Sequence, residues 1–359
     1  MSKGLNVVIF GPPLDRSGGV GTLFTYFRNE VGDDVNLRFV DTRGKYRFPI
    51  FSFINLFWAL VVATFLKFSK RIELAHLNMG SRGSTYRKLL LLLWLKIVLR
   101  TPTVLHLHAS GFDTWIEGVS RLKKSVIISL INKADRLLVL GKIWKQKMVE
   151  LGVNSDAVTV LVMGVPNLSE AQKIRKQSSG PIEVLFAGEM SERKGLPYLL
   201  NAMSDDRLFN FHLTVAGSGS TADWQTYIHN KPSSQRVTFL GLTPVADIHE
   251  RLRTTDIFIL PSRAEGLPVS VMEAFSSRTA VICSSVGALG EYLNDGVNSY
   301  VVEPKNTDSI AFSLYELRSE AARDRLSKSG HDTWLSSFNS RDTSARLIEI
   351  WRATITQHE

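Results

Sequence analysis

The sequence predicts an α/β protein of two doubly wound domains, each a parallel sheet covered by helices on both faces. Three observations predict it. Short, fully apolar strands alternate with longer helical patterns, which is typical of parallel sheets buried on both sides. The alternation pauses at a looser stretch containing Ser, Pro and Lys, residues 164–181, and then restarts. The length of 359 residues suits two hydrophobic cores better than one.

The first domain, residues 1–165, begins with the strand NVVIFG (6–11) and a helix over GTLFTYFRNEV (21–31). Its further expected strands are LRFVD, IELAHLN, TVLHLHA and RLLVLG. The second domain, residues 166–340, has the expected strands IEVLFAG, FHLTVAG, RVTFLG, IFILPS and AVICSS. Residues 341–359 are predicted to form a helix, with packing back on the first domain as one option. We expect the site in the crevice between the strand C-termini of the two domains.

The composition is that of a folded globular protein, with 44% hydrophobic and 21% charged residues. The single cysteine, Cys283, excludes an internal disulfide and is consistent with a reducing compartment. No signal peptide is expected, because MSKGLN runs straight into the first strand. These features favour a cytoplasmic location.

The net charge of +9 is unevenly distributed. Residues 1–165 contain 23 Lys and Arg against 11 Asp and Glu, a net of +12, and the rest contain 20 against 23, a net of −3. A basic first half indicates an anionic partner, such as phospholipid, nucleic acid or a phosphorylated substrate. Nucleic acid is disfavoured, because no aromatic-basic interleaving or known nucleic-acid module is present.

One apolar stretch, FSFINLFWALVVATFL (51–66), is shorter than the roughly 20 residues of a membrane span. The simpler interpretation is a helix that covers the sheet. The alternative is contact with one face of a membrane, because Lys67, Lys70 and Arg71 follow at once and further basic residues precede LLLLLWLKIVL.

The stretch SRAEGLPVSVMEAF (262–275) carries two glutamates around a Gly-Leu-Pro turn. It follows the expected strand DIFILPS, and Pro268 suits the first turn of a helix, so we expect the helix to begin near Leu267–Pro268. The positive end of that helix suits a phosphate. Glu273, inside the helix, can accept two ribose hydroxyls, and Glu265, before it, can meet the group beyond the phosphates.

EGLPVSVMEAF resembles the signature of the retaining, GT-B-fold glycosyltransferases of family 4. FAGEMSERKGLPYLLNAM (186–203), then GSGS after LTVA, VTFLG and SSVGALGEYLNDGVNSYVVEP (284–304) follow in that family's order. RSGGVGTLF and HLHASGFD resemble its first-domain glycine loop and histidine segment. The resemblance covers nearly the whole chain. It implies two Rossmann-like domains facing across a cleft, and a nucleotide diphosphate sugar as the donor, with uridine the commonest base.

The resemblance also implies roles for individual residues. Arg193 and Lys194 would bind the donor diphosphate, Glu273 the ribose, and Glu265 with the backbone of Gly266 and Leu267 the transferred sugar. Gly18, Gly19 and Gly217 would allow close approach to the donor, Pro268 would begin the helix beside the phosphates, and His108 would face the sugar. His106, two residues earlier, is expected to be structural. The expected catalytic set is His108, Arg193, Lys194 and Glu265, without a metal or other cofactor.

One departure concerns Glu189, which stands where the family usually has an arginine. A carboxylate there repels a diphosphate, so we expect Glu189 to point away and Arg193 to supply the charge. The alternative is impaired diphosphate binding, and with it a non-catalytic relative that only binds nucleotide sugars.

Simpler alternatives stay open for several residues. Arg193 and Lys194 are also explained as a solvated pair, His108 as a strand-end histidine, and Gly18, Gly19 and Gly21 as a turn. GSGSTA (217–222) fits a dinucleotide fingerprint, but no acidic residue ends the next strand, which argues against a dehydrogenase.

We therefore expect transfer of a sugar to a hydroxyl, with retention of configuration as the resemblance implies. The basic half and the apolar-basic stretches favour a lipid-linked or envelope glycan acceptor, and peripheral attachment to the inner face of the cell membrane. A soluble small-molecule acceptor is the alternative.

Overall fold

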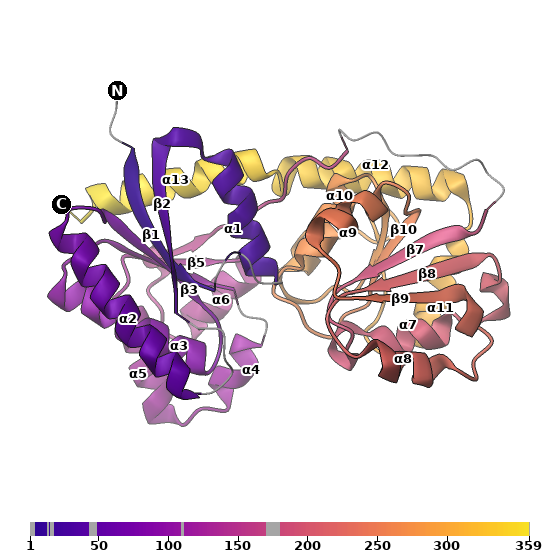
Figure 1. Ribbon diagram of the computed structural model, residues 1–359, viewed down its shortest axis with the longest axis horizontal. Coiled ribbons are helices and arrows are strands. Elements are labelled where there is room, and N and C mark those ends of the chain that lie inside the picture. Colours follow the sequence, from indigo (N-terminus) through magenta and orange to yellow (C-terminus); the bar gives the residue numbers. More distant parts are fainter. Residues whose placement is uncertain are drawn as a thin grey trace. The chain divides into compact units, whose positions relative to one another are not determined.

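The computed structural model describes residues 4–12, 14, 18–42, 49–108, 111–169 and 180–358. The chain separates into two compact units, residues 1–164 with 340–359 and residues 165–339. Each unit holds a six-stranded sheet whose strand pairs are parallel, which confirms the predicted α/β architecture (Figure 1). Most of the predicted linker, residues 170–179, lies outside the described part of the chain.

The first sheet has the strand order β2-β1-β3-β4-β5-β6. Every residue of its central strands β3 and β4 is buried, because helices cover both faces. Its strands are β1 (Leu5–Gly11), β2 (Val35–Asp41), β3 (Leu74–Met79), β4 (Thr103–Leu107), β5 (Arg136–Val139) and β6 (Val158–Val160).

Two groups of helices cover this sheet. Helix α3 contacts α2 and α5 on one face, and α1 contacts α13 on the other (Figure 1). The helices are α1 (Gly19–Glu30), α2 (Pro49–Phe68), α3 (Gly83–Leu93) with the π-helix η2 (Trp94–Val98), α4 (Phe112–Glu117), α5 (Arg121–Ile131), α6 (Lys142–Glu150) and α13 (Ser340–Thr356).

Helix α13 belongs to the first unit although it follows the whole second unit in sequence. Figure 1 shows it in yellow beside the indigo α1. Trp351 is fully buried, meets the ring of Phe27 edge to face at 5.3 Å, and donates from Nε1 to His76 Nδ1 at 3.1 Å. The helix therefore closes the core on this face of the sheet.

The second sheet has the order β12-β11-β10-β7-β8-β9. Its strands are β7 (Ile182–Ala187), β8 (Phe211–Ala216), β9 (Val237–Gly241), β10 (Ile257–Leu260), β11 (Ala280–Cys283) and β12 (Tyr300–Val301). Its helices are α7 (Leu196–Ala202), α8 (Thr221–Ile228), α9 (Val245–Leu252), α10 (Val269–Ser276), α11 (Thr307–Glu316) and α12 (Glu320–Ser337). Helix α7 packs on α11, and α10 on α12.

The sequence did not predict β6 and β12. Both are edge strands of two or three residues, too short to show a pattern. Every strand that the alternation predicted is present.

Helix α2 covers the sheet with one side only. Leu56, Ala59, Ala63 and Leu66 are buried along that side. The other side is exposed and also apolar, as described below. Among the described residues, no helix combines the length and apolar character needed to cross a membrane.

Candidate functional site

The strand order of the second sheet reverses between β7 and β10, and open α/β sheets bind ligands at the carboxyl ends of strands beside such a reversal. After β7 the chain forms a single 3₁₀ turn, Glu192–Lys194, that ends at Gly195. Gly195 has φ +78°, and a Cβ there would lie 2.0 Å from the carbonyl oxygen of Pro261. Glycine thus lets the turn carrying Arg193 and Lys194 lie against the loop that follows β10.

Lys194 and Glu265 meet in this loop. Lys194 Nζ lies 2.5 Å from Glu265 Oε1, and Ser262 Oγ donates to the same oxygen at 2.7 Å. The side chains of Lys194 and Glu265 are only 14% and 8% exposed. The carboxylate is therefore ion-paired, hydrogen-bonded and nearly dry. Ser262 belongs to the stretch SRAEGLPVSVMEAF (262–275), but no pattern in that stretch singled out this serine.

Arg193 lies at the rim of the same cluster. Its guanidinium donates to the carbonyl oxygen of Ala264 at 3.1 Å and comes within 4.0 Å of Glu265 Oε2. It also donates to Glu189 Oε2 at 2.8 Å, in a pair that is about half exposed. Glu189 therefore binds Arg193 and offsets part of the charge of its guanidinium.

Helix α10 carries the second glutamate. The helix begins at Val269, with Pro268 as its N-cap, one residue later than predicted. Glu273 is 5% exposed, and its Oε1 lies 3.2 Å from Nε2 of His249 on α9. Nothing in the sequence pattern pointed to His249, because only the fold brings α9 and α10 together.

The loop between Glu265 and Pro268 is held by a neighbouring turn. Ala288 N donates to the carbonyl oxygen of Gly266 at 2.9 Å. A Cβ at Gly287, where φ is +62°, would lie 2.1 Å from the carbonyl oxygen of Glu265. Gly287 is therefore a further residue that shapes the site. Leu267 lies in the same loop, directly before Pro268.

Gly217 lies at the carboxyl end of β8, beside the segment that follows β7. It has φ +143°, and a Cβ there would lie 1.7 Å from the carbonyl oxygen of Gly188. Its N–H donates to Gly241 at 2.8 Å. Only glycine allows these loops to approach so closely.

The remaining predicted residues belong to the first unit. Gly18 is the N-cap of α1, and Gly19 is the first residue of that helix; both are exposed. The carbonyl oxygen of Gly18 accepts from Thr22 N at 3.2 Å. The segments before Gly18 and after His108, residues 15–17 and 109–110, lie outside the described residues.

His108 follows β4 and forms a histidine cluster with His76 and His106. The rings of His106 and His108 lie 3.8 Å apart, and those of His76 and His106 5.3 Å apart. Burial lowers the pKa of His108 to about 3 and that of His76 to about 3, and it lowers the pKa of His106 well below its ordinary value. The cluster is therefore neutral at physiological pH.

Asn78, at the end of β3, fixes the orientation of His108. Its Oδ1 lies 2.9 Å from His108 Nε2, which leaves Nδ1 of the neutral ring as an acceptor. A Cβ at Gly11 would lie 2.7 Å from Asn78 Nδ2, so that glycine makes room for the amide. Neither residue was singled out from the sequence.

In the second unit, the segments that follow β7 and β10 bring Arg193 and Lys194 to the buried carboxylate of Glu265. Within the described ranges, no group of three or more His, Cys, Asp or Glu side chains is arranged to hold a metal ion.

Residues 169–332 match the family model Glycosyl transferases group 1. The match lies within the second unit, residues 165–339. The chain is 25% identical to a glycogen synthase of Mycobacterium tuberculosis over 263 residues, 70% of this chain and 63% of that protein. It is 25% identical to the amylovoran biosynthesis glycosyltransferase AmsK of Erwinia amylovora over 272 residues, 72% of this chain and 64% of that protein. The matches thus span less than two thirds of these relatives.

Two solved structures share the fold over nearly the whole chain. Sucrose-phosphate synthase from Thermosynechococcus elongatus has a TM-score of 0.80 at 15% identity, covering 98% of this chain and all of that one. HepE from Anabaena, solved in complex with UDP and glucose, has a TM-score of 0.75 at 16% identity, covering 96% and 99%. These neighbours confirm the GT-B type of fold.

Proposed function

We propose that this protein is a glycosyltransferase that moves a sugar from a nucleotide diphosphate sugar, with UDP as the nucleotide, to an acceptor hydroxyl. The observation that carries the proposal is the Lys194–Glu265 pair with Arg193 beside it, at the reversal point of the second sheet. The match to Glycosyl transferases group 1 and the UDP bound to HepE support it.

The cations have the first role in this proposal. Arg193 and Lys194 bind the diphosphate and neutralise the charge that grows on it as the glycosidic bond breaks. The amino end of α10 adds a positive dipole beside Pro268. Gly217, Gly18 and Gly19 let the backbone come close to the donor phosphates.

The carboxylates hold the neutral parts of the donor. Glu273 accepts the ribose hydroxyls, and Glu265, with the backbone of Gly266 and Leu267, accepts hydroxyls of the transferred sugar. Both carboxylates already have protein partners, so a donor that reaches them competes with Lys194 and Ser262 or with His249. His108, kept neutral by burial, accepts a sugar hydroxyl at Nδ1.

The transfer proceeds with retention of the anomeric configuration. The acceptor oxygen forms a bond to the anomeric carbon on the face from which the diphosphate leaves, and the acceptor proton passes to a leaving phosphate oxygen. No enzyme carboxylate needs to bond to the sugar. NMR of the product gives the anomeric configuration, and an inverted product contradicts this route.

The reaction needs no metal or other cofactor in this proposal, since Arg193, Lys194 and the end of α10 supply the positive charge. Turnover should be unchanged after EDTA treatment. A loss that magnesium restores contradicts this part of the proposal.

The acceptor we propose is a lipid-linked or envelope glycan at the inner face of the cell membrane. The similarity to AmsK, named for amylovoran biosynthesis, supports a polysaccharide product. A soluble acceptor is the alternative. An equal kcat/KM for a soluble sugar acceptor and for a lipid-linked acceptor would favour that alternative.

A thermal-shift panel of nucleotide sugars tests the donor, because a ligand that binds only the folded state raises the melting temperature. Release of the nucleotide diphosphate is then measured for the wild type and for Glu273→Ala. We expect the variant to lose the shift and most of its turnover. A shift without turnover in the wild type would identify a non-catalytic nucleotide-sugar-binding relative.

A further inference from the structure

The solvent side of α2 is apolar along its described length. Phe53, Ile54, Phe57, Trp58, Phe65 and Phe68, which we call the apolar face, are between 56% and 83% exposed. At about 200 Å² for each aromatic residue, its five aromatic residues expose roughly 700 Å². Monomeric proteins rarely leave an apolar patch above a few hundred Å² uncovered, so this face is suited to a partner.

Neighbouring helices extend the apolar face. Tyr86 and Leu90 on α3, Ile97 on η2, and Leu122 and Val126 on α5 are also exposed. Helix α3 contacts both α2 and α5, and Figure 1 shows the three helices on the same side of the first unit. The exposed apolar side chains therefore come from one continuous layer of helices.

The charge of this layer has one sign. Residues 49–71, 82–100 and 121–133 together contain 12 Lys and Arg and no Asp or Glu. Some of these cations serve inside the unit: Lys88 is buried, and Lys96 pairs with Asp135. Others, including Lys70 and Arg71 directly after α2, are exposed. The partner must be both apolar and anionic.

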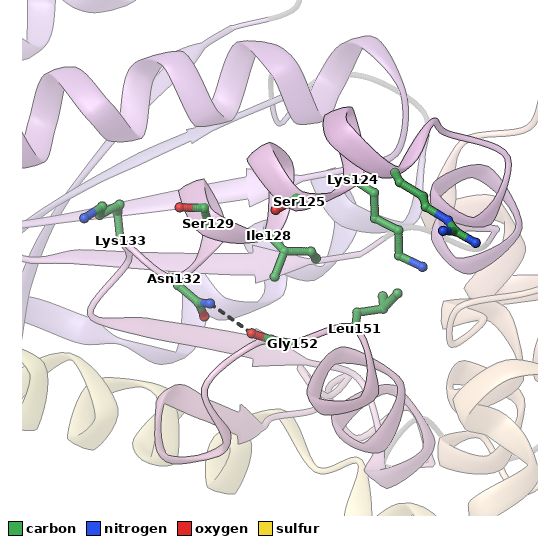
Figure 2. A pocket seen from close by; sticks show the side chains of 9 residues that line it. Lys124, Ser125, Ile128, Ser129, Asn132, Lys133, Leu151 and Gly152 are labelled. Atoms are coloured by element: carbon green, nitrogen blue, oxygen red, sulfur yellow. Dashed lines mark hydrogen bonds between the residues drawn. The ribbon is translucent and has the colours of Figure 1, made fainter.

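Helix α5 joins the apolar layer to a cationic groove. Arg121, Lys124, Ser125 and Ser129 line an open groove of about 580 Å³ that faces the turn at Leu151 (Figure 2). Figure 2 shows Lys124 and Lys133 at opposite ends of the groove. Ammonium, guanidinium and hydroxyl groups together suit phosphate oxygens.

We propose that the first unit binds a bilayer containing anionic phospholipid, with the apolar face of α2 lying in the headgroup–acyl boundary and the groove of α5 binding headgroup phosphates. An anionic bilayer supplies apolar and negative groups over the whole area at once, and aromatic side chains are favoured at that boundary. This inference rests on the proposed acceptor and deepens it. Its test uses neither donor nor acceptor, so the membrane inference and the proposed function can each fail independently.

Cosedimentation with phosphatidylcholine vesicles, with and without phosphatidylglycerol, tests the inference at low and high salt. We expect binding to the anionic vesicles that weakens with salt. The double variant F57S/W58S should weaken binding at least tenfold, and R121Q/K124Q should remove most of the preference for phosphatidylglycerol. Phe209→Ser, an equally exposed aromatic residue of the second unit, and Lys328→Gln are the matched controls and should bind as the wild type does.

Position in the bilayer is tested separately with bromine-labelled lipids, which quench tryptophan fluorescence. Trp58→Phe should bind vesicles like the wild type but lose most of the quenching. Binding that is equal for F57S/W58S and Phe209→Ser overturns the inference. So does self-association that depends on Phe57 and Trp58 without vesicle binding, which would make the face an interface between two copies. The melting temperatures of all variants should match the wild type, because every changed side chain is exposed or, for Lys124, only half-buried.

Discussion

A double-mutant cycle on Lys194 and Glu265 can separate the structural part of this ion pair from its proposed catalytic part. The variants are Lys194→Met, Glu265→Gln and the double variant. Both side chains are nearly dry, so either single change leaves one buried polar or charged group without its partner. Such a loss costs about 3–5 kcal/mol. For a unit the size of residues 165–339, this corresponds to a melting temperature lower by roughly 6–20 °C.

The double variant removes both charges, so most of the melting temperature should return. Turnover should not return. Loss of one preorganised charge opposite the leaving group costs about 2.7–4 kcal/mol of barrier, a fall in kcat of about 10²–10³. Calorimetry and nucleotide-release kinetics on the same samples give both quantities.

Turnover that recovers together with stability in the double variant would refute the reasoning, because the pair would then serve only the fold. Arg207→Met is a suitable control. Arg207 pairs with Asp205 at 2.6 Å on the surface, and its loss should change neither quantity appreciably.

Three further predictions concern other residues of the two units. Glu189→Gln should release Arg193 from its half-exposed pair and so tighten the binding of a nucleoside diphosphate about two- to fivefold, as measured by calorimetry. Weaker binding would mean that Glu189 instead orients the guanidinium of Arg193. Gly217→Ala should lower the free energy of unfolding by at least about 3 kcal/mol in denaturant titrations. The control Gly296→Ala, also at positive φ but with open space around its Cβ, should lower it by about 1 kcal/mol. Equal losses would contradict the close approach of Gly217 to Gly188. The histidine cluster is buried in the neutral form, and its pKa values lie below those of the unfolded chain. Its contribution to stability is therefore complete above pH 6.5 and is lost as the pH falls. The free energy of unfolding should fall by about 1.4 kcal/mol per pH unit for each ring. Between pH 6 and 5 the melting temperature should fall less steeply for His106→Phe than for the wild type, and an identical slope would refute this account.

The sequence predicted the fold well because its signals are local and repeated. The central strands of both sheets are fully buried, so they appear as mostly apolar runs. The run of β10 is uninterrupted, whereas that of β3 contains His76 and Asn78. The short edge strands β6 and β12 have no such run and were missed. Helix α2 is apolar on both sides, so periodicity alone could not tell its buried side from its exposed side.

The site was predictable in part, because its motifs are local but the contacts between them are not. Glu265 and Lys194 stand in recognisable motifs, but their ion pair joins residues 71 positions apart and depends on how closely two loops approach. His249 and Asn78 lie outside those motifs, and only the packing of α9 on α10 and of β3 beside β4 gives them their partners. Glu189 was recognised as unusual, but its ion pair with Arg193 depends on how the segment after β7 folds.

The position of α13 has a consequence for biosynthesis. The helix that supplies Trp351 to the first unit is translated only after residues 165–339, which takes roughly 10–35 s at typical bacterial and eukaryotic elongation rates. During that interval the nascent first unit lacks the indole that covers Phe27 and His76. The first unit is thus begun first and completed last. The core surface that it exposes in the meantime is a binding site for a chaperone on the nascent chain.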